Sequence, residues 1–217
     1  MRRHDRARRR GAEEAALREL DRIRAPLFKE LERLLGDPEY LRGEEPHACC
    51  LREKNQMRIS PLEARAIARA FRTDPDLRAR LPAVLRRLRD ELRRLQDTSE
   101  RQSFDCPLLE GTRCLVHDRA KPIGCTAWHP GREFSREGWK AFTARDELND
   151  SLYGPDWKLR VIPLWLNRVL AAEPGERARK GGGPGIRGGA SHRGKASRPR
   201  SRAGARSGSS PSRRRRG

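Results

Sequence analysis

The residues of this chain best suited to chemistry are its five cysteines, which fall into two groups. Cys49 and Cys50 are adjacent, and Cys106, Cys114 and Cys125 lie within one stretch of twenty residues. Clustered thiolates bind zinc or iron, and four of them are enough for one tetrahedral zinc ion or one iron–sulfur cluster. The grouping therefore predicts a metal site. The competing interpretation is a set of free or incidentally buried thiols.

Disulfide bonds are the less favoured use of these cysteines. The first ten residues carry the positive charge that begins a secretory signal, but no apolar segment follows them. We therefore expect a cytoplasmic protein, in which thiols stay reduced and clustered cysteines serve as metal ligands or catalytic groups. The count agrees, because five thiols cannot all pair within one chain and a bridge between two adjacent cysteines strains the backbone.

Three histidines lie close to the cysteines in sequence and are candidates for additional ligands. His47 precedes Cys49 by two residues, and His117 and His129 follow the later cysteines by three and four residues. Imidazole replaces a thiolate in many zinc sites. The alternative is that these histidines only hydrogen-bond near the site or occupy ordinary loop positions.

The segments that must position the cysteines have helical patterns. Apolar residues at three- and four-residue spacing predict a helix over 13–35, with Pro26 as a place for a bend. Ser60-Pro61-Leu62-Glu63 is a capping box that opens a second helix. Thr73-Asp74-Pro75 opens a third helix, in which the leucines from 81 to 95 form an apolar stripe. The other side of this helix is rich in Arg, includes Asp90 and Glu91, and is expected to face solvent.

The rest of the chain completes the expected architecture. Residues 104–130 are rich in Pro and Gly, as expected for a loop organised by a metal. Ser135 is a candidate cap for a further helix, and 157–170 is a last apolar segment. We expect a mainly α fold, a small helical scaffold with irregular cysteine-rich metal-binding loops at 12–172. Disordered basic tails are expected at 1–11 and 173–217.

The net charge of +20 belongs mostly to the two ends of the chain. Residues 180–217 hold twelve Lys and Arg and no acidic residue, residues 1–10 contribute +5, and the remaining body carries only +3. Such tails predict weak binding to nucleic acid without sequence preference. No base-reading motif is present, and no apolar run is long enough for a membrane span, so no membrane partner is expected.

The motifs together resemble the YkgJ-like cysteine-cluster family. The matching pieces are Cys49-Cys50, Ile59-Ser60-Pro61-Leu62-Glu63, Cys106-Pro107-Leu108-Leu109, Cys114, Lys121-Pro122 and Cys125, which span roughly residues 43–130. The chain departs from the family's Cys-x2-Cys-x2-Cys-Cys motif, because Gly43 and Pro46 stand at two of the cysteine positions. Two thiols are thus missing, which argues against a site for more than one metal ion.

The resemblance implies a domain that chelates zinc or iron through Cys49, Cys50, Cys106, Cys114 and Cys125. An iron–sulfur cluster stays open, because the spacings match neither common zinc knuckles nor ferredoxin runs. Two other function classes also stay open. One is a lysine N-methylase-like enzyme that carries the same cluster, although no catalytic motif is found and the enzyme question is undecided. The other is a nucleic-acid-associated accessory protein that acts through its basic tails.

Overall fold

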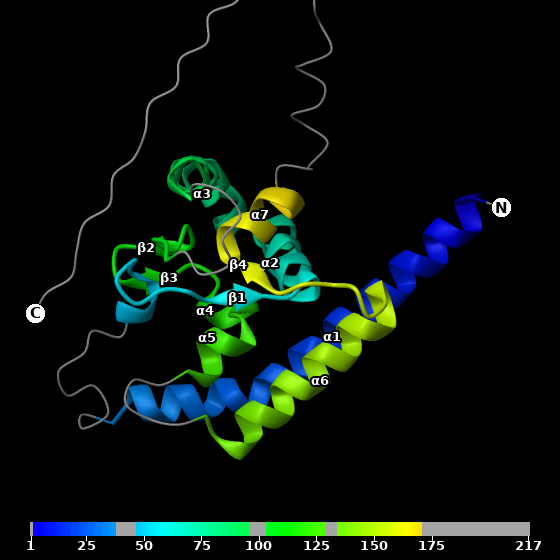
Figure 1. The fold of residues 1–217 in the computed structure, drawn as a ribbon, viewed down its shortest axis with the longest axis horizontal. Coiled ribbons are helices and arrows are strands. Elements are labelled where there is room, and N and C mark those ends of the chain that lie inside the picture. Colours follow the sequence, from blue (N-terminus) through cyan, green and yellow to red (C-terminus); the bar gives the residue numbers. More distant parts are fainter. Residues whose placement is uncertain (1, 38–46, 96–102, 129–133, 171–217) are drawn as a thin grey trace, which may run out of the picture. The chain divides into compact units, whose positions relative to one another are not determined.

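A computed structural model describes residues 2–37, 47–95, 103–128 and 134–170 (Figure 1). The chain divides into two units, Met1–Gly181 and Gly182–Gly217, and all the described residues belong to the first. The expected C-terminal tail, 173–217, and His129 lie outside the described residues.

The described part is mainly α-helical, as the sequence predicts. The helices are α1 (Arg2–Leu35), α2 (Pro61–Thr73), α3 (Pro75–Arg94), α4 (His117–Ala120), α5 (Ile123–Ala127), α6 (Arg136–Tyr153) and α7 (Ile162–Leu170), and the 3₁₀ turn is η1 (Ala48–Cys50). Short strands form two antiparallel pairs, β1 (Arg58–Ile59) with β4 (Arg160–Val161) and β2 (Leu109–Glu110) with β3 (Arg113–Cys114). No helix in the described ranges combines the length and hydrophobicity needed to cross a bilayer.

The structure corrects the prediction that residues 1–11 form a disordered tail. Residues 2–11 are the first turns of α1, which runs without interruption to Leu35 and contains Pro26. Arg and Ala, which dominate this segment, are good helix formers, and Gly11 is the only residue among 2–11 with a strong penalty. Composition and charge predicted disorder for this segment. Its residues instead extend α1 toward the N-terminus, and the later turns of α1 pack on other helices. Figure 1 shows α1 changing direction in its C-terminal part.

Capping residues set the starts of the helices that flank the cysteine loops. Ser60 and Glu63 form the predicted reciprocal capping box at α2, and Asp74 accepts hydrogen bonds from Asp76 N and Leu77 N at α3. Ser135 accepts from Gly138 N at α6. These predicted starts are confirmed.

The helices pack in two groups, which contact each other directly through α1 and α2 and are also bridged by the short helices of the cysteine region. One group is the pair α1 and α6, and the other contains α2, α3 and α7 (Figure 1). Helix α5 packs on α1 and α6, and α4 packs on α2. The core includes Leu20, Ile59, Leu62, Ile67, Phe71, Leu88, Phe104, Ile123 and Leu166, each with at most 1 % of its surface exposed. The cysteine region therefore lies between the two helix groups.

Candidate metal centre

The five sulfur atoms, here called the cysteine cluster, come from four separate segments. Cys49 and Cys50 lie on η1, Cys106 precedes β2, Cys114 ends β3, and Cys125 lies on α5. All five are free thiols; Cys106 is buried and the other four are half-buried. The long Pro/Gly-rich segment that was predicted as a loop thus contains a hairpin and two short helices.

Backbone hydrogen bonds bring the first two segments together. Cys106 N donates to Cys50 O at 2.9 Å, and Phe104 N donates to Asn55 O at 3.1 Å. The buried Asn55 side chain donates to Cys50 O at 3.4 Å and accepts from Met57 N at 3.1 Å. This small network fixes Cys50 beside Cys106, although more than fifty residues separate them in the chain.

Electrostatic contacts connect the thiols of all four segments. Cys49 Sγ and Cys50 Sγ are 4.0 Å apart, and the Cys50 thiol also interacts with Cys106 and Cys114. Cys125 interacts with Cys49, Cys50 and Cys114. The structure therefore brings together the five cysteines that the sequence singled out.

The same contacts make the thiols hard to ionise. A hydrogen bond with Cys50, together with burial, raises the pKa of Cys49, and a hydrogen bond with Cys106 raises the pKa of Cys50. Burial raises the pKa of Cys114 and, more strongly, that of Cys125. The ammonium of Lys121 is the nearby positive charge that partly opposes these effects. A bound cation would stabilise the thiolates where the protein alone does not.

The thiols are gathered without being in coordination geometry. Among the residues that the structure describes, no three Cys, His, Asp or Glu side chains are placed so that they could share one metal ion. Ligation therefore requires the sulfur atoms to approach one another. Rotation about the Cα–Cβ bond moves a cysteine sulfur between staggered positions and leaves the backbone in place.

Two buried glutamates hold the cysteine segments, and the sequence did not reveal either role. Glu91 is 4 % exposed and accepts two hydrogen bonds of 2.8 Å from the Arg52 guanidinium and one of 3.2 Å from Asp105 N. Arg52 and Asp105 each lie one or two residues from a cysteine, so one carboxylate joins both segments to α3. The expectation that Glu91 lies on a solvent-facing helix surface is wrong, because this ion pair with Arg52 draws it inward.

Glu63 performs the equivalent task for the last cysteine. One carboxylate oxygen accepts from Ser60 N at 2.8 Å within the capping box, and the other accepts from Ile123 N at 2.9 Å. Ile123 begins α5, which carries Cys125. Arg145 of α6 lies 3.7 Å away and balances the buried charge. The capping box was visible in the sequence, but its second hydrogen bond to a residue 60 positions away was not.

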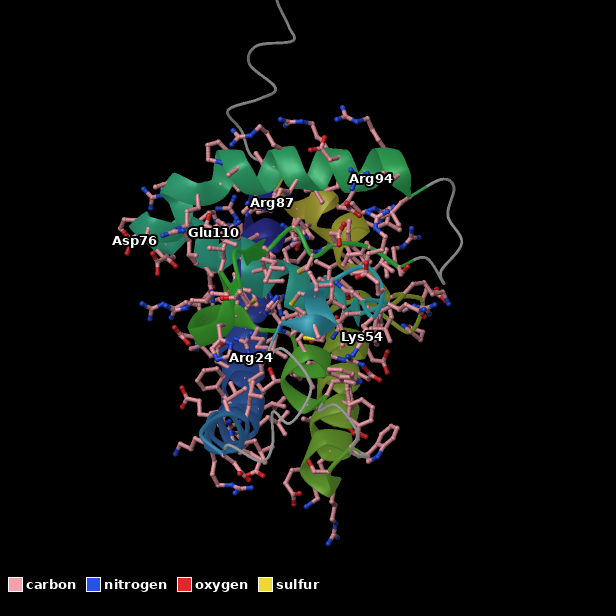
Figure 2. The ribbon with its side chains drawn as sticks, turned by 90° about the vertical axis from the view of Figure 1, so that its left-hand side faces the viewer. Arg24, Lys54, Asp76, Arg87, Arg94 and Glu110 are labelled. Carbon is pink, nitrogen blue, oxygen red and sulfur yellow. The ribbon has the colours of Figure 1, made fainter. Side chains whose placement is uncertain are left out.

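Two arginines contact the cysteine segments from the two helix groups. Arg87 Nε of α3 donates to Pro107 O at 2.9 Å. Burial lowers the pKa of Arg87, and the nearby Cys106 partly offsets that lowering. Arg24 of α1 donates to Lys121 O and Arg119 O, both at 3.3 Å. Figure 2 shows Arg87 on α3 above the segments of η1, β2 and β3, and Arg24 on α1 below them.

The candidate histidines differ in their surroundings. His47 precedes η1, and His117 begins α4. The His117 ring packs edge-on against Phe28, and its Nδ1 lies 3.4 Å from Lys121 Nζ. Burial and the charge of Lys121 lower the His117 pKa. These contacts direct His117 toward the α1 side, so its role as a ligand stays a prediction.

Comparisons with protein-family models, curated proteins and solved structures found no match for this chain.

Proposed function

We propose that this protein binds zinc or iron, the latter alone or in an iron–sulfur cluster, through Cys49, Cys50, Cys106, Cys114 and Cys125. The observation that carries the proposal is the convergence of five free thiols from four segments on one half-buried place. Nothing in hydrophobic packing calls for all five cysteines of a chain to meet. Metal ligation accounts for both their number and their convergence.

The surroundings of the cluster suit a cation. Burial and neighbouring thiols raise the pKa of four of the five cysteines in the metal-free protein, and the charge of a bound cation would offset these effects on the thiolates. Thiolate donors favour zinc and iron over magnesium or calcium. Hydrogen bonds to Glu63 and Glu91 hold the segments of Cys50, Cys106 and Cys125 in the fold. The methylase-like alternative gains no further support from the described residues.

Elemental analysis and an absorption spectrum test the proposal. Full-length protein is purified without oxygen and compared with Cys106→Ser/Cys114→Ser and with Thr112→Ser, a matched variant at an exposed position of the same hairpin. Stoichiometric zinc without colour, or iron with visible charge-transfer bands, is expected in the wild type and in Thr112→Ser and is expected to be lost in the double variant.

Circular dichroism at the helix band shows whether the double variant keeps its helices, so that metal loss is separated from unfolding. The proposal would be contradicted if the wild-type protein contained no metal after purification and also bound none after addition of Zn²⁺ or Fe²⁺.

A further inference from the structure

A second site lies away from the cysteine cluster, at the junction of α2, α6, β4 and α7. A pocket of about 470 Å³ opens there, within the size range of pockets that bind small organic ligands. Most of its lining side chains are cationic or aromatic. We call it the aromatic–basic pocket; the residues used below are Arg65, Lys158, Arg160, Arg168, Trp157 and Trp165.

The side chains that line the pocket carry more positive than negative charge. Asp156 is the one acidic residue among the lining side chains, against four Lys and Arg. No salt bridge involves any of these four cations within the described part of the chain, whereas Arg24 of α1 and Arg52 are each paired with a carboxylate. An unpaired group of four cations around a concave surface attracts a polyanion.

The aromatic rings of the pocket are held in place before any ligand arrives. Trp157 Nε1 donates to Asp150 Oδ1 at 2.6 Å, and Trp165 Nε1 donates to Lys158 O at 3.2 Å. The Arg168 guanidinium lies over the Trp165 ring, with its central carbon 5.4 Å from the ring centroid. Fixed indoles and a planar guanidinium are the surfaces on which unpaired nucleobases stack.

We infer that the aromatic–basic pocket binds single-stranded nucleic acid, with phosphates at Arg65, Lys158, Arg160 and Arg168 and a base stacked at Trp157 or Trp165. A single strand fits better than a duplex, because the bases of a duplex are already stacked and cannot reach the indoles. The four cations suit several successive phosphates, and a mononucleotide carries only one. The inference does not depend on the metal proposal.

Fluorescence anisotropy with a labelled short oligo(dT) tests the inference on the full chain. Arg65→Gln/Arg168→Gln removes two pocket charges, and Arg86→Gln/Arg89→Gln removes two exposed charges from α3 as the matched control. We expect the dissociation constant to rise about tenfold in the pocket variant and less than about twofold in the control. An equal loss in both variants would assign binding to overall charge and overturn the inference.

The aromatic part of the inference needs its own readout. Bound oligo(dT) is expected to quench tryptophan fluorescence in the wild type, and Trp165→Leu is expected to reduce both the quenching and the binding that remains at high salt. A duplex of the same length is added to compete with the labelled strand. Uridine monophosphate is added in a second competition, to test whether a free nucleotide binds the pocket equally well.

The inference is overturned by any of three results in these measurements. They are a duplex that competes as well as the single strand, a mononucleotide that binds as tightly as the strand, and unchanged tryptophan fluorescence. Helix content by circular dichroism confirms that each variant compared is folded.

Discussion

The side chains around the cysteine cluster divide into those that carry sulfur and those that hold the sulfur-bearing segments. The first kind was singled out in the sequence, because the cysteines fall into two compact groups. The second kind was not. Glu91 looks like an ordinary surface residue of a helix, and the sequence marks Glu63 only as part of a capping box. Their contacts with Arg52 and Ile123 arise only on folding.

Metal binding at these thiols is expected to depend steeply on pH. Since contacts and burial raise the pKa of Cys49, Cys50, Cys114 and Cys125, these groups are protonated at neutral pH in the metal-free protein. Each ligand must lose a proton when metal binds, so the apparent zinc affinity rises with pH and falls in acid.

Isothermal titration of Zn²⁺ in buffers of different ionisation enthalpy measures these protons. Release of about three or four protons per zinc at neutral pH is expected for a site of three or four thiols. Release of fewer than about one proton would contradict thiolate ligation. Cys106→Ser/Cys114→Ser is the control, because it removes two ligands.

At the scale of elements, the predicted starts of α2, α3 and α6 are confirmed because each rests on a local signal. Ser60, Asp74 and Ser135 bond to backbone groups within three residues, so the sequence contains all the partners. The pairing of β1 with β4 was not predicted. Arg58 and Val161 are more than a hundred residues apart, and two-residue strands leave no alternating pattern to detect.

Glu91→Gln is expected to loosen both early cysteine segments from α3. The amide keeps the shape but loses the charge that binds Arg52 and presents a donor to Asp105 N. We expect a loss of roughly 1–3 kcal/mol in the free energy of unfolding. Asp90→Asn, one position earlier on the same helix and paired with exposed Arg93, should change it by less than about 0.5 kcal/mol. Urea denaturation compares the two, and equal effects would show that Glu91 is no clamp.

Two glycines of helices are expected to respond in opposite directions to alanine. Gly154 ends α6 with φ at +75° and ψ at 176°, a region essentially restricted to glycine that costs an L-residue about 1–3 kcal/mol, so Gly154→Ala should destabilise the protein. Gly11 lies inside α1 with no atom within 4 Å of the place a Cβ would take, so Gly11→Ala should add up to about 1 kcal/mol. Thermal melts measure both changes. If Gly154→Ala stabilised the protein, the backbone conformation observed at the end of α6 would be contradicted. If Gly11→Ala destabilised it, the helical state of residues 2–11 would be contradicted.

At the scale of the whole molecule, the mainly α fold was predictable from hydrophobic periodicity. The division into an α1–α6 pair and an α2–α3–α7 group was not, because helix patterns do not state which helix packs on which. Charge was misleading at the N-terminus, where residues 2–11 are helical.

Metal binding is expected to stabilise the entire described fold, since the cluster joins segments from 49 to 125. A metal at roughly a hundred times its dissociation constant adds about 2.7 kcal/mol to the free energy of unfolding. Melting with Zn²⁺ should therefore occur several degrees higher than with a chelator. The same comparison in Cys106→Ser/Cys114→Ser should show no difference. A shift of equal size in that variant would place the stabilising metal elsewhere.

The antiparallel pair β1–β4 also bears on how the protein is made. Helix α2 buries Leu62 and Ile67 in a core that includes Leu166 of α7, and β4 reaches back to β1 immediately before α7 begins. In a nascent chain that ends before residue 162, α1 and α3 are available to pack on α2, but the part of α2 that contacts α7 has no partner, while all five cysteines have already been made. Until α7 is added, a chaperone would have an apolar surface to cover and a metal ion would have all of its thiol ligands.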